Sequence, residues 1–492
     1  MRGIAGALVA ACGLAVLLGS VAPATSASAA PRDPIDGFEY VALGDSYQAG
    51  FGLTPYSDTS PFADGPLNGC YQALANYPQL VATDLGLTIT DETCSGAVTA
   101  NIGYASGVTI PSPPATGPLT GLPTGSQVQT TMAGKVAPAV QSAALSATTD
   151  IVTIGIGGND LGFASIAMAC VRDSVGASSY PLYLYWVSPG ITFDNCKQYF
   201  DDQVTYPDAY LKDRLATYVV PRLEATLTQV KAAAPNAQVF VVGYPQIAPA
   251  DATDACFTSP TSVDAVPLSG VDINFVHEIE GLLDEAIESA AAAHGAHYIN
   301  TWDDTAANTL CTPEPWIWGL TAYVNLSGPC DPGYINGDSS GWICVKLGAL
   351  HPNAGGVENI RQLVAATIPT AFFTRIVDGS FEPGGSVTVE GGGFWPGESV
   401  ELVLHSTPVT IATVTANAAG GFATTAAVPS SVPPGAHTLV ATGLTSGHAF
   451  SASVALAMPA TGAEFAGPAV AGALLLLIGG ALIVAARRRP TA

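Results

Sequence analysis

Short apolar runs rich in β-branched residues alternate with stretches of helical spacing between residues 38 and 370. This alternation limits the fold more than any other feature, because it predicts parallel strands covered by helices on both faces of a sheet. The expected strands span residues 38–45, 87–94, 150–160, 237–245 and 296–301, and the expected helices span residues 71–85, 211–230, 271–295 and 351–368. Pro221 lies inside the second of these helices and is expected to mark a kink or a helix start.

Residues able to carry out chemistry follow the expected strands, at the edge where parallel sheets bind ligands. Ser46 lies in GDS after the first strand, Gly96 in CSGAVT after the second, and Asn159 in GIGGND after the third. His351 lies in LHPN, just before the last helix. Ester hydrolysis needs a hydroxyl nucleophile, a base that takes its proton, and hydrogen-bond donors for the oxyanion. These four residues can supply all three parts.

The same set of motifs, in this order, resembles the SGNH (GDSL-type) hydrolase superfamily over residues 38–370, and is most similar to the secreted lipases and esterases of actinobacteria. The resemblance implies a flavodoxin-like three-layer α/β/α sandwich, placed at residues 30–372, and an ester hydrolase with no metal and no organic cofactor. It implies that Ser46 is the nucleophile and His351 the general base. The oxyanion hole would consist of the backbone amides of Ser46 and Gly96 and the side chain of Asn159.

One position departs from the superfamily pattern, which usually has an aspartate three residues before the histidine. That position is Gly348 in this chain. The histidine could be oriented by a backbone carbonyl, with Gly348 as the expected residue, by a carboxylate such as Asp303, Asp304 or Asp338, or not at all in an impaired enzyme. We favour the carbonyl, because the main task of the third group is to hold the imidazole tautomer.

Two further acidic residues near these motifs receive structural interpretations. Asp45 is expected to be a turn or capping residue next to the serine, and Asp160 is expected to brace its loop.

The pattern of apolar and polar residues changes after about residue 375. Residues 375–457 alternate apolar and polar side chains in short runs between Gly and Pro turns, which predicts an all-β sandwich. The segment resembles the small immunoglobulin-like modules that precede wall anchors in actinobacterial surface proteins. We expect a spacer or a binding module without catalytic residues.

The N-terminus has the features of an export signal. Residues 1–29 combine an early arginine, an apolar stretch and a small-residue cleavage site, which is typical of a secretory signal peptide.

The C-terminus has the order of a surface anchor. The motif MPATG at 458–462 precedes an apolar run at 467–486, expected to be a transmembrane helix, and a basic tail at 487–492, expected in the cytoplasm. The combination resembles a sortase sorting signal, which implies cleavage between Thr461 and Gly462 and transfer to cell-wall peptide. A permanently membrane-anchored ectodomain is the alternative, and both interpretations place the protein on the extracellular face.

Cysteine number and net charge agree with an exported protein. Of the nine cysteines, Cys12 lies in the signal segment, and the other eight form an even set expected to pair as disulfides. Pairing of neighbours along the chain is the prediction: Cys70–Cys94, Cys170–Cys196, Cys256–Cys311 and Cys330–Cys344. The net charge of −24 argues against nucleic acid as a partner.

The sequence therefore favours an extracellular, surface-anchored serine esterase or lipase that acts through an acyl-enzyme on an acylated lipid or carbohydrate. The alternatives are a polysaccharide acetylesterase or phospholipase of the same chemistry, or a catalytically retired adhesin. Substrate choice would depend on the expected loops at 101–135, 176–200 and 311–345.

Overall fold

The structure, a computed structural model, describes most of the chain between residues 35 and 456. The described residues are 35–57, 70–111, 140–163, 166, 196–205, 210–253, 269–324, 330–331, 334–336, 343–379, 381–405 and 408–456. Outside them lie the signal segment, the MPATG motif, the expected transmembrane helix and the basic tail. Most residues of the loops expected at 101–135 and 176–200 also lie outside them. Among the described residues, no helix has both the length and the apolar character needed to cross a membrane.

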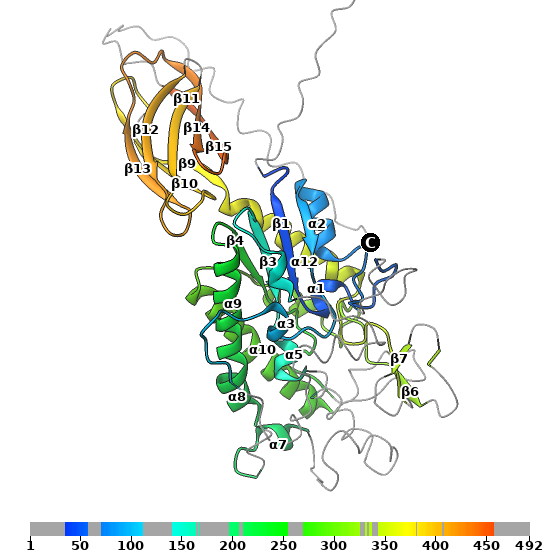
Figure 1. The fold of residues 1–492 in the computed structure, drawn as a ribbon. Coiled ribbons are helices and arrows are strands. Elements are labelled where there is room, and N and C mark those ends of the chain that lie inside the picture. Colours follow the sequence, from blue (N-terminus) through cyan, green and yellow to red (C-terminus); the bar gives the residue numbers. More distant parts are fainter. Residues whose placement is uncertain are drawn as a thin grey trace, which may run out of the picture.

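Five parallel strands form the central sheet, in the order β2-β1-β3-β4-β5 (Figure 1). The strands are β1 (Glu39–Gly44), β2 (Thr88–Asp91), β3 (Ile151–Gly155), β4 (Gln238–Val242) and β5 (His297–Ile299). Every residue of β3 is buried, which is the burial expected of a parallel strand covered on both faces. The predicted α/β architecture is confirmed, and the strand order is that of flavodoxin-like sheets.

Helices cover both faces of the sheet (Figure 1). The sheet therefore separates the hydrophobic core of the domain into two layers. Alternate residues of β1 point to opposite faces. Tyr40 and Ala42 pack in one cluster with α2 (Tyr77–Leu85) and α12 (Ala354–Thr367). Val41 and Leu43 pack in the other with α9 (Val220–Ala233) and α10 (Gly270–Ala293).

Short helices connect these layers at the strand ends and in the loops. They are α1 (Ser46–Ala49), α3 (Thr99–Ile102), η1 (Gln141–Ala144), α5 (Gly158–Leu161), α7 (Cys196–Asp201), α8 (Leu211–Arg214), η4 (Leu215–Val219), α11 (Trp302–Thr305), η5 (Ala306–Asn308) and η6 (Ile368–Ala371).

Two of the expected helices differ from the prediction, one in where it begins and the other in its hydrogen bonding. The helix predicted from residue 71 begins only at Tyr77, because the Asn76 side chain accepts the backbone N–H of Gln79 and caps it. The helix predicted over 211–230 contains a π-helical turn, η4, just before α9. Pro221 follows this turn in a helix that continues without a break, so its missing N–H falls where the regular α-helical hydrogen bonding is already interrupted.

A small antiparallel sheet lies within the loop expected at 311–345. Its strands are β6 (Ala322–Val324), β7 (Tyr334–Asn336) and β8 (Ile343–Lys346), in the order β6-β8-β7. The Cys330–Cys344 disulfide, with an S–S distance of 2.10 Å, closes this loop. A second disulfide, Cys70–Cys94, joins the segment before α2 to the loop that follows β2. The other two expected pairs include Cys170 and Cys256, which lie outside the described residues.

The C-terminal module consists of two antiparallel sheets, in the orders β13-β10-β9 and β12-β11-β14-β15. Its strands are β9 (Phe373–Gly379), β10 (Ser386–Gly392), β11 (Ser399–His405), β12 (Val409–Thr415), β13 (Phe422–Ala427), β14 (Gly435–Gly443) and β15 (Ala449–Leu456). The predicted antiparallel β structure is present, and the relation to immunoglobulin-like modules stays a prediction. The module packs beside the N-terminal ends of β1 and β3 (Figure 1), where His448 contacts Asp150.

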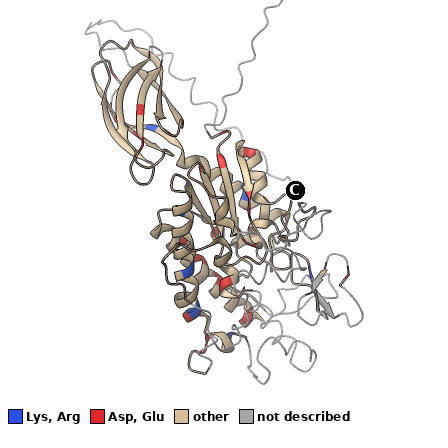
Figure 2. Ribbon diagram, viewed as in Figure 1, with Lys and Arg blue, Asp and Glu red and all other residues tan. Residues whose placement is uncertain are grey.

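Acidic residues are spread over both parts of the molecule. Figure 2 shows Asp and Glu on strands and helices throughout the described chain, and Lys and Arg at only a few places. Lys197 and Lys212 pair with Asp201 and Glu278, which ties α7 and α8 to α10.

Candidate active site

Ser46 is presented by a tight turn at the carboxyl end of β1. Gly44 has φ +142°, and a Cβ there would lie 2.5 Å from the carbonyl oxygen of Gly155, so only glycine fits this strand end. Asp45 then caps α1, because its side chain accepts the backbone N–H of Tyr47 at 3.0 Å. Ser46 is the first residue of α1 and is 8% exposed. The turn therefore brings the serine hydroxyl to the edge of the sheet.

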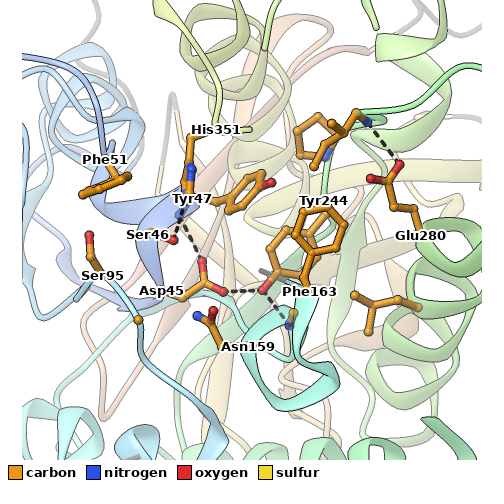
Figure 3. A pocket seen from close by; sticks show the side chains of 15 residues that line it. Asp45, Ser46, Tyr47, Phe51, Ser95, Asn159, Phe163, Tyr244, Glu280 and His351 are labelled. Carbon is orange, nitrogen blue, oxygen red and sulfur yellow. Dashed lines mark hydrogen bonds between the residues drawn. The ribbon is translucent and has the colours of Figure 1, made fainter. Parts of the chain in front are cut away.

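His351, which lies near the end of the domain's sequence, contacts that hydroxyl. Its Nε2 lies 2.7 Å from Ser46 Oγ (Figure 3), although the two residues are 305 positions apart in the chain. The histidine lies in the turn before α12, and Leu350 adopts a left-handed φ of 63° immediately before it. The rings of Tyr47 and Phe51 pack against the imidazole, with centroids 4.7 and 4.9 Å away.

The group that orients His351 is a backbone carbonyl, but it belongs to Ala349 and not to Gly348. The Nδ1 atom of His351 lies 2.8 Å from the Ala349 oxygen. The prediction of Gly348 was wrong because its carbonyl accepts the backbone N–H of His351 at 2.9 Å and closes the turn. A ring that donates from Nδ1 to a carbonyl presents the lone pair of Nε2 to the serine.

Burial keeps the imidazole neutral. It lowers the pKa of His351 to about 4, and the hydrogen bond to the Ala349 carbonyl only partly offsets this. A neutral ring at physiological pH is the form that can accept a proton from serine.

The carboxylates considered as substitutes for the missing aspartate have other partners. Asp303 accepts from Asn300 at 2.9 Å, and Asp304 accepts from Asn359 at 2.6 Å. Asp338 lies outside the described residues.

The two expected oxyanion residues lie beside Ser46. Gly96, with φ +78°, is in the turn after β2, and Asn159 is in α5 after β3. The side-chain amide of Asn159 donates to the Ala97 carbonyl at 2.9 Å, which links these two loops. Both residues line the same cavity as Ser46 and His351.

Asp160 braces the same two loops. It is 2% exposed, accepts the Thr99 backbone N–H at 2.9 Å and the Thr99 hydroxyl at 2.5 Å, and lies 3.8 Å from the guanidinium of Arg222. Burial raises its pKa, and the Thr99 hydrogen bonds and the two nearby arginines oppose this rise. The carboxylate therefore fixes α3 against α5, and with them Gly96 and Asn159.

A mainly apolar cavity of about 200 Å³ opens beside the serine. Figure 3 shows the side chains around it. It is lined by Asp45, Ser46, Tyr47, Phe51, Ser95, Gly96, Gly158, Asn159, Phe163, Tyr244, Pro245, Ile247, Glu280, Leu283 and His351. The aromatic and aliphatic members of this set can accept an acyl chain or a similar apolar group.

Tyr244 and Glu280 are cavity residues that sequence reasoning missed. The Tyr244 hydroxyl donates to the Asp45 carboxylate and accepts the backbone N–H of Gly158 at 3.1 Å. Burial raises the pKa of Asp45 to about 7, although its hydrogen bonds with Tyr244 and Tyr47 lower it. One signal could have indicated Glu280: it is an acidic residue at the buried helical spacing of Val276, Leu283 and Ile287.

No group of three or more His, Cys, Asp or Glu side chains among the described residues is arranged to hold a metal ion. His277, for example, has its Nδ1 2.9 Å from the carbonyl of Ala248.

A parallel sheet with a serine–histidine pair at its carboxyl edge has the architecture of a hydrolytic enzyme. The chain matches the model of the GDSL-like lipase/acylhydrolase family over residues 42–358. It therefore belongs to this family of the SGNH superfamily and is a carboxylic ester hydrolase, which confirms the expected membership.

Several proteins of Streptomyces are similar to this chain. Lipase 2 of Streptomyces coelicolor is 31% identical over 296 residues, which cover 60% of this chain and 79% of the relative. An esterase of Streptomyces scabiei is 29% identical over 352 residues, which cover 66% of this chain and 89% of the relative. A solved structure of phospholipase A1 from Streptomyces albidoflavus NA297 has a TM-score of 0.42 and 21% identity, and the match covers 68% of this chain and 99% of that one.

Proposed function

We propose that this family member is an extracellular serine esterase or lipase that forms an acyl-enzyme on Ser46 with His351 as the base. The observation that carries the proposal is the 2.7 Å contact between Ser46 Oγ and a histidine whose other nitrogen faces the Ala349 carbonyl. The names of the Streptomyces relatives, lipase and esterase, support carboxylic esters as substrates.

In the proposed first half-reaction, Ser46 Oγ attacks the ester carbonyl carbon while its proton moves to His351 Nε2. The carbonyl oxygen becomes an oxyanion that accepts hydrogen bonds from the backbone N–H groups of Ser46 and Gly96 and from the Asn159 amide. The tetrahedral species collapses, the C–O bond to the alcohol breaks, and the alcohol leaves with the proton from His351.

The second half-reaction repeats these steps with water. His351 takes a proton from water, whose oxygen attacks the acyl carbon, and the proton returns to Ser46 Oγ as the carboxylic acid leaves. The Ala349 carbonyl would hold the ring through both half-reactions, as a Ser–His dyad, and would stabilise the imidazolium less than a carboxylate does.

The lining of the cavity favours a long apolar substrate group over a short acetyl group. Phe51, Phe163, Ile247 and Leu283 offer an apolar surface that an acetyl group would leave unused. We therefore place the protein with esterases and lipases of longer acyl chains, ahead of polysaccharide acetylesterases.

The test is hydrolysis of p-nitrophenyl esters from acetate to palmitate by the purified protein and its Ser46→Ala variant. We expect serine-dependent turnover with a maximum beyond acetate. A maximum at acetate would favour the acetylesterase, and turnover that persists in the Ser46→Ala variant would contradict the mechanism. A protein inert toward every ester would favour the retired adhesin.

We also propose that residues 1–29 are removed on export and that MPATG directs attachment through Thr461. The order of motif, apolar run and basic tail supports this placement. Mass spectrometry of the wall fraction should identify a C-terminal peptide that ends at Thr461 and carries wall peptide. A peptide that continues through Gly462 into the apolar run would instead indicate a permanent membrane anchor.

A further inference from the structure

Glu280 is an acidic side chain in the wall of an otherwise mainly apolar cavity. It lies in α10 and is 8% exposed. Its neighbours on the buried face of the helix, Val276 and Leu283, are apolar. Burial of a carboxyl group is unfavourable unless its oxygens have partners, so this position needs an explanation.

Only one of its two oxygens has a hydrogen-bond partner among the residues that the structure describes. Oε2 accepts the backbone N–H groups of Ile247 and Ala248, both at 3.2 Å. Oε1 is buried and has no hydrogen-bond partner in the described part of the chain. The two amides explain the position of Oε2, and no described group does the same for Oε1.

The proton of this carboxyl belongs on Oε1. Burial raises the pKa of Glu280 to about 8, although the two backbone N–H groups lower it, so the neutral form predominates at pH 7. Because Oε2 already accepts two N–H groups, the hydroxyl lies on Oε1. The group is therefore a hydrogen-bond donor beside the cavity.

Apolar groups occupy the wall between this donor and the nucleophile. In the view of Figure 3, Tyr244 and Phe163 lie between Ser46 and Glu280. Ile247 and Leu283 line the same cavity. A substrate that spans this space would contact apolar walls first and then a polar atom.

We propose that Glu280 determines specificity by donating a hydrogen bond to an oxygen atom of the substrate, separated from the reacting ester by an apolar segment. The preferred substrates are then esters with a hydroxyl, ether or second carbonyl oxygen in the chain that enters the cavity. This inference rests on the proposed ester hydrolysis at Ser46 and deepens it by naming the substrate class.

The test compares matched esters that differ by one oxygen. One series consists of p-nitrophenyl octanoate and analogues in which a chain methylene is replaced by oxygen at successive positions. A second series places the same oxygen in the alcohol portion of octanoate esters. The measured quantity is kcat/KM for each ester relative to its all-carbon counterpart.

For the wild-type protein we expect one position, in one of the two series, to be preferred by about 10-fold or more over the all-carbon ester, because a site built to hydrogen-bond an oxygen discriminates against its absence. Glu280→Gln should keep the preference, since the amide oxygen can accept the two backbone N–H groups while its nitrogen donates. Glu280→Leu should lose it and favour the plain chain. Glu278→Gln, an exposed change on the same helix, should leave the preference unaltered.

A flat profile in both series for the wild-type protein would overturn the inference without any variant, even if Glu280→Leu fails to fold. An oxygen preference that persists in a folded Glu280→Leu variant would overturn it as well. Both results require active enzyme. Absence of hydrolysis of every ester by the wild-type protein would instead overturn the proposed function itself.

Discussion

Gly348 shows how one backbone position determines the type of active site. The residue has φ +84°, and a Cβ there would lie 2.7 Å from Cα of Gly52 and 3.1 Å from Trp318 Cδ1. The position therefore excludes any side chain, including the aspartate that the superfamily usually has. Its carbonyl closes the turn that aims the next carbonyl, of Ala349, at His351.

Restoring the aspartate should therefore damage the enzyme. We expect Gly348→Asp to lower stability by roughly 2–5 kcal/mol through left-handed strain and overpacking, and to lower kcat/KM by about 10-fold or more as the histidine moves. Gly348→Ala, the matched control without the charge, should lose similar amounts. Thermal unfolding and ester hydrolysis measure both effects. A Gly348→Asp variant more active than both Gly348→Ala and the wild type would show that a carboxylate is the missing part.

The low pKa of His351 predicts activity that persists into acid. The base must be neutral, and burial lowers the pKa of His351 from its usual 6.5 to about 4. The active fraction is therefore lost only as the pH falls through the lowered value. We expect kcat/KM for a neutral ester to have an acid limb at least about one unit below 6.5.

Asp45 is a second group that could produce an acid limb, because it adjoins the proposed nucleophile Ser46 and its pKa is raised to about 7. A variant at this position therefore provides the control for the pH profile. Asp45→Asn keeps a capping side chain and removes that titration. If the acid limb belongs to His351, it should remain in the variant. An acid limb near 7 in the wild type that disappears in Asp45→Asn would assign the limb to Asp45.

The residue scale also shows what sequence can and cannot predict. Ser46, Gly96, Asn159 and His351 were predictable, because each lies in a short motif next to a strand end or a helix start. The Ala349 carbonyl was not, because it depends on the course of the backbone through one turn. Tyr244 also escaped prediction, since the only reason to select it is that it contacts Asp45 across the sheet.

At the scale of elements, side-chain hydrogen bonds join the carboxyl ends of β1, β2 and β3 to neighbouring segments. The backbone N–H of Gly44 donates to the Gln141 side chain at 2.7 Å, and the Gln141 amide donates back to the Gly44 carbonyl at 2.9 Å. The end of β1 is thereby fixed to η1. Asp160 does the same for the loops after β2 and β3, so the proposed oxyanion donors are positioned by a residue that does not line the cavity.

Asp160→Ala should accordingly reduce catalysis. The change leaves the backbone N–H and the hydroxyl of Thr99 without their acceptor and removes the carboxylate 3.8 Å from Arg222, so the loops that carry Gly96 and Asn159 are held less firmly. We expect kcat to fall by about 10²-fold, close to the loss of one oxyanion donor, with a smaller change in KM. Asp303→Ala, which removes an acidic residue whose hydrogen bonds in the described chain are with Asn300, should change neither constant. An Asp160→Ala variant with wild-type kcat would show that the loops hold their places without this carboxylate.

Elements were more predictable than their boundaries. All five strands and the main helices agree with the periodicity of the sequence, because burial on one or two faces leaves a regular pattern. The start of α2 and the π-helical turn before α9 depend on single capping and packing interactions, which periodicity does not record. The small sheet of β6, β7 and β8 was not predicted at all, since strands of three or four residues are too short for a pattern.

At the scale of the whole molecule, the β module is tied to the hydrolase domain through His448. Its Nε2 lies 3.0 Å from Asp150 Oδ1 and its Nδ1 lies 2.8 Å from the Gly393 carbonyl oxygen. Both nitrogens face acceptors, so the fully protonated ring satisfies both contacts. Burial lowers the pKa of His448, but Asp150, the Gly393 carbonyl and Glu398 outweigh it, and the pKa rises above 6.5.

The sign of this shift predicts how stability depends on pH. Because the folded protein binds the proton more tightly than the unfolded chain, the stabilisation is complete below the unfolded pKa of about 6.5 and is lost as pH rises through the higher folded value. We expect His448→Gln to unfold at a temperature lower than the wild type by roughly 2 °C or more at pH 6. The difference should shrink toward pH 9. A difference that stays constant across this range would show that His448 contributes by packing alone, for example against Phe38.

The measurement that bears most directly on the proposed mechanism is the site of reaction with a fluorophosphonate. The purified wild-type protein is treated with the reagent, digested and analysed by mass spectrometry, beside its Ser46→Ala and His351→Ala variants. We predict a single adduct on the peptide that contains Ser46, none in Ser46→Ala, and labelling slowed by several orders of magnitude in His351→Ala. Labelling of another residue, or equal rates for the wild type and His351→Ala, would contradict a Ser46 nucleophile activated by His351.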